Sequence, residues 1–328
     1  MPRRSTDLTA AYLGRFLIGA GSACAFVGSL TLAGRWFAPN RYAFMSGLTM
    51  LCGMAGGLLG QAPLAHLVDA VGWRDAMLTS SVFAACLAVA VWLIVRDRPP
   101  SHAGMSGHDA ASGALDSIRA TLSKPRVWCV MGVGASFSGP LLAFGGLWGV
   151  PYFMVKYGLD RPDAAFYVSL NLIGWAIGAP LGGWLSDHLG RRKAPLVMVG
   201  LFNLLFMGIL FYVPGIPLEL AAGLVFGIGL VGSSMVICYA LARELTPPST
   251  HGTVTGFINM GTVGAGAILQ PAIGIMLDVY WDGATADGVR IYSLQAYNTA
   301  FICLMAASAL GLNLALMLRE TYCRQQVE

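Results

Sequence analysis

The stretch Gly183-Trp-Leu-Ser-Asp-His-Leu-Gly-Arg-Arg-Lys193 joins two apolar runs, each long enough to cross a bilayer. It carries one carboxylate, Asp187, and three consecutive cations in a connection too short to form a domain. Two membrane-spanning helices therefore end together at one membrane face, with a tight turn and a charge cluster between them. Gly183 lets a neighbouring helix approach closely, and Gly190 can adopt the positive φ that ends a helix.

The pattern G-x-L-x-D-x-x-G-R-R in this stretch resembles the loop signature of the major facilitator superfamily of secondary transporters. Gly183, Leu185, Asp187, Gly190, Arg191 and Arg192 fill its main positions, and His188 stands where the family usually has a cation. The resemblance covers nearly the whole chain. It implies an all-α membrane protein with a major-facilitator-like helical bundle.

We expect the loop to act as a conformational gate rather than as a substrate site. Glu244 ends a later span on the same side, so it can pair with Arg191 or Arg192. The exposed amides at the start of the span after Gly252 are expected to attract Asp187. The predicted gate residues are Gly183, Asp187, Gly190, Arg191, Arg192, Arg243 and Glu244.

Composition places the protein in the membrane. Of its 328 residues 56% are hydrophobic and 11% are charged, against about 25% charged residues in a soluble domain. The net charge is only +4, and the cations fall in loops, so a nucleic-acid partner is not expected. The seven cysteines lie mostly inside apolar runs without paired spacing, which favours packing over disulfides or metal binding. No catalytic triad, phosphate loop or metal-ligand cluster is present in the sequence, so neither an enzyme nor a cofactor is predicted.

Nine apolar runs have the length of a membrane span. A polar stretch, 96–125, separates the third from the fourth, and its Leu115, Ile118 and Leu122 recur at helical spacing, which predicts an amphipathic helix on the membrane surface. The predicted spans are 14–37, 42–71, 76–95, 126–155, 163–187, 194–213, 217–243, 252–279 and 293–318.

The cations predict the topology. If the 183–193 loop is cytoplasmic, alternation puts thirteen of the twenty Lys and Arg residues on the cytoplasmic side and seven outside, as the positive-inside rule requires. We therefore expect a multi-pass protein of the bacterial cytoplasmic membrane, with the bilayer and a small-molecule solute as its partners. The sequence does not specify an oligomeric state.

An internal repeat relates the two parts of the chain. Residues 46–69 match 255–278 at an offset of 209, with Gln61 opposite Gln270. The first span matches the seventh at an offset of 208, which places Arg35 opposite Arg243. Parallel repeats of this kind are typical of the two halves of major facilitator transporters. By the same register, we expect the nine spans to correspond to helices 4–12 of twelve. The expected units are 1–95, the remaining part of the first half, 96–125, a cytoplasmic linker, and 126–328, a six-helix bundle.

Neutral polar side chains are the candidates for solute binding, because every Asp and Glu falls in a loop or at a span end. Gln61 and Gln270 share a repeat position, and either solute contact or hydrogen bonding between helices would explain them. Asn171 and Trp175 share one face of a span, where packing is the alternative. The complete predicted set is Gln61, Ser138, Asn171, Trp175, Ser234 and Gln270; for the two serines, close helix packing is favoured.

The stretch from Gly145 to Tyr152 contains three glycines and a proline at the end of a predicted span. Such a helix can bend or unwind, as broken helices do at transporter sites, although Trp148 and Tyr152 are also placed to act as anchors at the outer interface. The sequence as a whole predicts a transporter of a small polar organic solute that works by alternating access. The alternative is a truncated or non-transporting sensor or interaction protein with a transporter-like fold.

Overall fold

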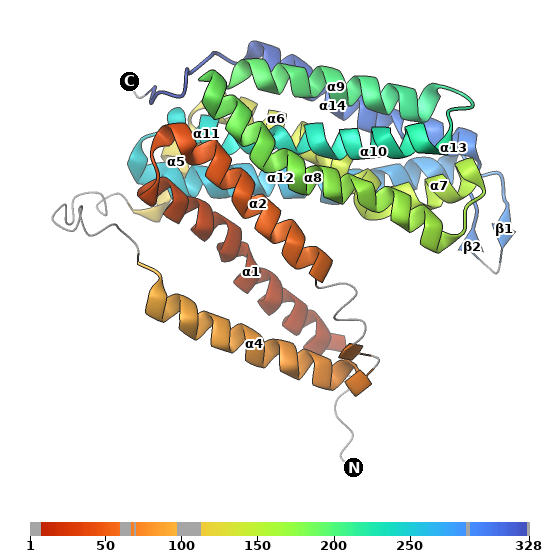
Figure 1. The fold of residues 1–328 in the computed structure, drawn as a ribbon, viewed down its shortest axis with the longest axis horizontal. Helices are drawn as coiled ribbons and strands as arrows, with labels where there is room; N and C mark the ends of the chain where they lie inside the picture. The colour runs from red at the N-terminus through yellow and green to blue at the C-terminus, as the bar shows by residue number, and fades with distance from the viewer. Residues whose placement is uncertain (1–7, 60–66, 69, 97–112, 287–288, 327–328) are drawn as a thin grey trace.

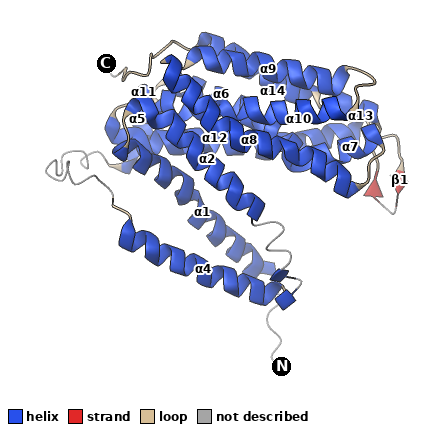
Figure 2. Cartoon of the chain, in the orientation of Figure 1, coloured by secondary structure: helices blue, strands red, loops and turns tan. Residues whose placement is uncertain are grey.

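The computed structural model describes residues 8–59, 67–68, 70–96, 113–286 and 289–326, and nearly all of these residues are helical (Figure 2). The all-α fold is therefore confirmed; in the described part of the chain the exception is one pair of antiparallel strands of two residues each. The long helices are α1 (Leu8–Trp36), α2 (Tyr42–Leu59), α4 (Trp73–Ile94), α6 (Pro125–Ala143), α8 (Arg161–Leu189), α9 (Lys193–Tyr212), α10 (Leu218–Gly232), α12 (His251–Val279) and α14 (Ile302–Met317). Shorter elements are η1 (Pro39–Arg41), α5 (Ala114–Leu122), η3 (Phe144–Trp148), α7 (Gly149–Tyr157), η4 (Ser233–Val236), α11 (Ile237–Glu244), η5 (Pro248–Thr250), α13 (Leu294–Ala300), β1 (Thr285–Ala286) and β2 (Val289–Arg290).

Eight helices in the described residues are long and apolar enough to cross a membrane. They correspond to eight of the nine predicted spans. The remaining predicted span, 42–71, is second in chain order. It is helical over Tyr42–Leu59, and the rest of it falls mostly outside the described residues. Gly190 ends α8 with a φ of 61°, the left-handed conformation that its place in the loop signature predicts.

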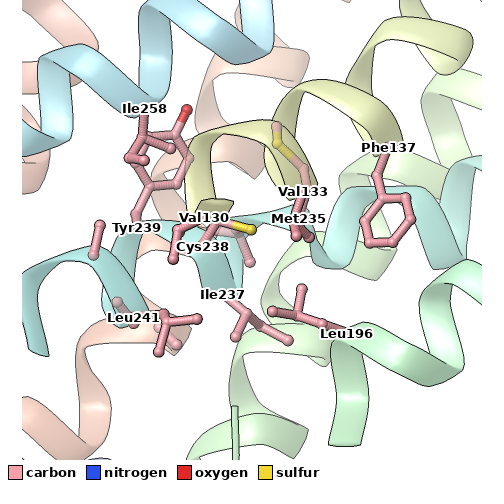
Figure 3. Packing of buried hydrophobic residues seen from close by; sticks show 14 of the residues in the cluster. Val130, Val133, Phe137, Leu196, Met235, Ile237, Cys238, Tyr239, Leu241 and Ile258 are labelled. Carbon is pink, nitrogen blue, oxygen red and sulfur yellow. The ribbon is translucent and has the colours of Figure 1, made fainter. Parts of the chain in front are cut away.

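The C-terminal helices form one bundle, in which α8 packs on α10, α6 on α12 and α14, and α9 on α14. Its core has two clusters. One lies where α6, α9, α11 and α12 meet, around Val133, Met235 and Tyr239 (Figure 3). The other is aromatic and surrounds Phe144, with Tyr152 and Phe301 in ring contact with it.

The three N-terminal helices are arranged differently. In Figure 1, α1 and α2 meet the C-terminal bundle near α5 and α11 and diverge from it toward their other ends, and α4 lies farthest away. Among the described side chains of α4 only Ala76 is buried. Among the described residues, α1 packs on α12, and α2 packs on α8 and α11. The hydrogen bonds to the bundle come from Leu30 of α1 and Phe44 of α2.

Helix α5 has its apolar side chains on the outside. Leu115, Ile118 and Leu122 are exposed, whereas Ser117 and Thr121 are buried against the protein, where α5 contacts α12 and η5. A surface helix in water would have the opposite arrangement. The helix therefore presents an apolar face outward at the level where α6 begins, as a helix at a membrane interface does.

Candidate functional site

The loop between α8 and α9 is built around one fully buried cation, Arg192. Its Nη1 lies 2.6 Å from Oδ1 of Asp187, and its Nη2 lies 2.9 Å from Oε1 of Glu244. The side chain of Arg192 is 0% exposed, and those of the two carboxylates are 8% and 7% exposed. A guanidinium can be buried in this way only when carboxylates and hydrogen bonds replace its water. We call Asp187, Arg192 and Glu244 the charge cluster.

The pKa of Arg192 reflects this balance. Burial alone would lower it, but the carboxylates of Glu244 and Asp187 raise it above the ordinary arginine value. The neighbouring Arg191 is exposed and makes no ion pair within the described residues. Of the two arginines predicted as partners of Glu244, the structure thus uses the second.

Asp187 connects the charge cluster to the N-terminal helices. Its Oδ2 accepts a hydrogen bond of 3.0 Å from the backbone amide of Phe44, in the first turn of α2. A carboxylate at a helix N-terminus is stabilised by the unpaired amides and by the helix dipole. The expectation that Asp187 would meet the start of α12 is therefore wrong. It meets α2, the helix that the internal repeat makes equivalent to α12.

Helices α2 and α8 pack backbone against backbone beside this hydrogen bond. A side chain on Gly183 would overlap the Ala43 carbonyl, and one on Gly47 would overlap the backbone at Ala179. Gly183 and Ala179 are four residues apart on α8, and Ala43 and Gly47 are four residues apart on α2. Each helix thus contributes two small residues, one turn apart, to the contact. A second face of α8, with Gly174 and its neighbours at four-residue spacing, is as close to α10 and η4.

Arg243 makes further contacts with the N-terminal helices α1 and α2. Its guanidinium lies 4.3 Å from the centre of the Tyr42 ring at the start of α2, and its Nη1 donates to the carbonyl of Leu30 in α1 at 3.3 Å. Gly34 leaves the space for this side chain. A cation over an aromatic ring needs no carboxylate partner, and none lies within ion-pair distance among the described residues.

The segment after α14 also holds the charge cluster, a role that the sequence did not suggest. Glu320 accepts from the backbone amides of Arg192 at 2.6 Å and Lys193 at 3.1 Å, and so caps the N-terminus of α9. The hydroxyl of Thr321 donates to Glu244, and the amide of Gln326 donates to the Glu244 carbonyl at 2.7 Å. The sequence offered one signal for this role, the carboxylate of Glu320 just after the last span. A carboxylate at that place does not by itself indicate which helix it caps.

Deeper in the bundle, the π-helical turn η3 lies between the end of α6 and the start of α7. Pro140, four residues earlier, cannot donate a backbone hydrogen bond. Two predicted solute-binding residues lie on either side of this turn: a side chain on Gly145 would meet the Asn171 amide, and one on Gly146 would meet the Gln270 amide. The glycine-rich stretch is therefore irregular, as expected.

These two carboxamides differ in their hydrogen bonds. Nε2 of Gln270 donates to the Leu142 carbonyl at 3.1 Å, which is the bond between helices that was the alternative for this residue. Asn171 is fully buried, and neither amide atom has a hydrogen-bond partner. A buried polar group without a partner costs free energy. Two residues of the predicted set therefore have unused hydrogen-bonding capacity: Asn171, at both amide atoms, and Trp175, at Nε1. Asn203 in α9 is in the same position and was not singled out from the sequence.

The remaining predicted solute-binding residues are mostly packed. Trp175 is 4% exposed within the core. Ser138 donates to the Thr262 carbonyl at 2.7 Å, and Ser234 fills the space left by Gly182. Gln61 lies outside the described residues.

The interpretation of Trp148 and Tyr152 as outer interfacial anchors is wrong. Nε1 of Trp148 donates to the Gln270 carbonyl at 2.9 Å, and its ring lies against Gly274. Tyr152 is fully buried and donates to the Leu210 carbonyl at 3.1 Å. Both side chains pack within the bundle: α7 lies against α8, and the two hydrogen bonds reach α12 from Trp148 and α9 from Tyr152. No group of three potential metal ligands lies among the described residues.

The chain is similar in sequence to membrane transporters and to a sensor. It is 24% identical over 301 residues to the uncharacterized transporter YybO of Bacillus subtilis, covering 82% of this chain and 66% of the relative. Over 126 residues it is 37% identical to the gallate transporter of Pseudomonas putida, covering 37% of this chain and 27% of the relative. The membrane sensor protein UhpC of Escherichia coli is 27% identical over 252 residues, covering 70% of this chain and 56% of the relative. The chain thus spans less than two thirds of the length of these relatives.

Solved structures show the same fold. A bacterial homologue of the iron transporter ferroportin, in an outward-facing state, superposes with a TM-score of 0.68 at 16% identity, over 96% of this chain and 75% of the other. The fucose:proton symporter FucP of Escherichia coli gives 0.64 at 15% identity, over 93% and 76%. The sequence model of the Major Facilitator Superfamily matches residues 5–271 and 149–322. With the loop signature, the helical bundle and this match in agreement, the chain belongs to the Major Facilitator Superfamily.

Proposed function

We propose that the protein transports a small polar organic solute by alternating access, with the charge cluster as a latch on the cytoplasmic side. One observation carries this proposal: at the end that carries the loop signature, a carboxylate of the buried charge cluster caps α2, beside a glycine-lined contact between α2 and α8. A joint of this kind has two discrete arrangements, closed and dry or open and wet. Rocking of the halves around a central site requires such a two-state joint.

Helix α8 supports the proposal by its position. Its Gly174 face packs on α10 within the C-terminal half, and its Gly183 face packs on α2 of the N-terminal half. Cytoplasmic opening would separate only the second contact. Asp187, in the last turn of α8, and Arg192, the N-cap residue of α9, would then stay together, while the hydrogen bond to Phe44 would break.

The proposed solute site is the region of η3. Asn171 offers a donor and an acceptor without partners, and Gln270 lies across the same turn. A solute with hydroxyl or carboxylate groups would satisfy the Asn171 amide, to which no protein group among the described residues is hydrogen-bonded. Gln61, by the internal repeat, is proposed to face the same region from the N-terminal half.

The experiment is a ligand screen followed by uptake. Purified protein is heated with a panel of small polar organic solutes that includes gallate, and a solute that raises the melting temperature is then tested for uptake into proteoliposomes. We expect Asn171→Ala to abolish both effects. Asn313→Ala is the matched control, because Asn313 is exposed on α14 and its amide bonds only to its own helix. Equal loss in both variants, or uptake unchanged in Asn171→Ala, would remove the proposed site.

The similarity to the sensor UhpC supports a second candidate function, solute sensing without transport. The same screen separates the two. A solute that stabilises the protein and depends on Asn171, but does not accumulate in proteoliposomes under any ion gradient, would favour the sensor.

A further inference from the structure

A groove on the face that carries the loop signature has no role in the proposed transport. It has a volume of about 110 Å³ and lies where α6 begins, α11 ends and α14 ends. Its lining combines two arginines with apolar side chains and one thiol: Arg126, Cys129, Leu245, Met317, Leu318 and Arg319. The groove lies outside the bundle interior, at the ends of three membrane spans.

Both arginines of the groove are exposed, and neither has an ion-pair or hydrogen-bond partner among the described residues. The nearby carboxylates are already engaged. Glu320, next to Arg319 in sequence, caps α9, and Glu244 is held by Arg192 and Thr321. The two guanidinium groups lie beside one groove, and the nearby carboxylates of Glu244 and Glu320 are bonded to other groups. The two arginines can therefore bind an anion.

The floor of the groove limits the kind of anion. Leu245 and Leu318 are buried beneath it, and Met317 is 76% exposed beside it. A free inorganic anion would gain no binding free energy from contact with these apolar side chains. A molecule with a negative headgroup and hydrocarbon chains matches both parts of the groove.

The position of the groove at the end of a predicted membrane span agrees with binding of a lipid headgroup. Nε1 of Trp128 donates to the Leu122 carbonyl at 2.9 Å, and its half-exposed ring stands where interfacial tryptophans stand. Nζ of Lys124 donates to the Leu245 carbonyl at 3.1 Å, which ties the start of α6 to the rim of the groove and adds a third positive charge. The cations thus lie at headgroup level, directly above apolar surface.

We propose that this groove binds an anionic phospholipid of the cytoplasmic leaflet, with the phosphate between Arg126 and Arg319 and an acyl chain along Leu245, Leu318 and Met317. The lipid would hold the ends of α6, α11 and α14 together. This site is independent of solute transport and of Asn171.

The test is native mass spectrometry of the full chain in detergent, with phosphatidylglycerol or phosphatidylcholine added. We expect the parent protein to retain phosphatidylglycerol preferentially. The double variant Arg126→Ala/Arg319→Ala should lose about 30-fold in that preference, the effect of removing two cations near an anionic headgroup. Arg119→Ala/Arg324→Ala is the matched control, since it removes two exposed cations outside the groove lining.

Three results would overturn the proposal. An equal loss in both double variants would mean that binding follows the general charge of this face. An unchanged preference in Arg126→Ala/Arg319→Ala would place the lipid elsewhere. Displacement of the lipid by glycerol phosphate at equal concentration would show that the groove takes a soluble phosphate and that the apolar floor contributes nothing.

Discussion

Replacement of Asp187 by Asn should weaken the closed arrangement of the two halves without unfolding the protein. The carboxylate uses both oxygens: one meets Arg192 at 2.6 Å and the other accepts from the Phe44 amide at 3.0 Å. An asparagine has one acceptor oxygen and no charge, so at least one of these contacts is lost. Arg192 keeps its pair with Glu244 at 2.9 Å, so the buried guanidinium is not left alone.

The size of the effect follows from which contact differs between the two states. In the proposed opening, the bond to Arg192, between α8 and the start of α9, is expected to survive, whereas the bond to Phe44 of α2 is expected to break. A hydrogen bond to a charged group contributes about 1.5–3 kcal/mol. Since about 1.4 kcal/mol is a factor of ten, the ratio of closed to open protein should fall about tenfold to hundredfold. In a transporting protein, the transport rate should fall and solute affinity should change only through this population shift.

Hydrogen exchange at the start of α2 measures the change directly, because the Phe44 amide is protected by Asp187 itself. We expect its exchange to accelerate about tenfold or more in Asp187→Asn, with expression close to that of the parent. Asp160→Asn is the control: Asp160 caps its own helix, α8, through Asp163 at 3.0 Å and makes no contact between the halves. Exchange of the first turn of α2 at the parental rate in Asp187→Asn would refute the latch.

Three further changes test other parts of the same end. Gly183→Leu should force α2 away from α8, because any side chain there overlaps the Ala43 carbonyl, and should lower stability by about 1–3 kcal/mol in thermal unfolding; Gly223→Leu, in open space, should be neutral, and equal effects would contradict the contact. Glu320→Ala should cost about 0.5–2 kcal/mol by uncapping α9, seen as faster exchange of its first turn, and unchanged exchange would exclude the cap. Burial raises the pKa of Cys323 from 9.0 to about 11, so the thiolate is scarce below that pH. In a variant whose only thiol is Cys323, alkylation at pH 8 should be about a hundredfold slower than for a thiol of pKa 9.0, and should speed up as pH rises toward 11.

The bundle was predictable because each span needs its own apolar run, and the lengths of those runs are set by the bilayer. The turn at Gly190 was predictable as well, because a glycine between an apolar run and three cations is typical of a residue that ends a helix in the left-handed conformation. What could not be predicted was the state of each polar residue within a span. Asn171 and Gln270 look alike in sequence, yet one is unpartnered and the other bonds to Leu142. That difference depends on the π turn at η3, which no local pattern of glycine and proline fixes.

The charge cluster shows a second limit of the sequence. The residue types in the loop predicted a carboxylate at a helix N-terminus, and the structure has one, but two helix starts were available by the internal repeat. The start of α12 belongs to the same half as Asp187, whereas the start of α2 belongs to the other half. Sequence distance favoured the first, and the close contact of Ala43 with Gly183 selects the second. For the proposed latch this difference is decisive: a cap within one half would only stabilise a helix, whereas a cap on α2 would make the strength of that hydrogen bond part of the proposed equilibrium between closed and open arrangements.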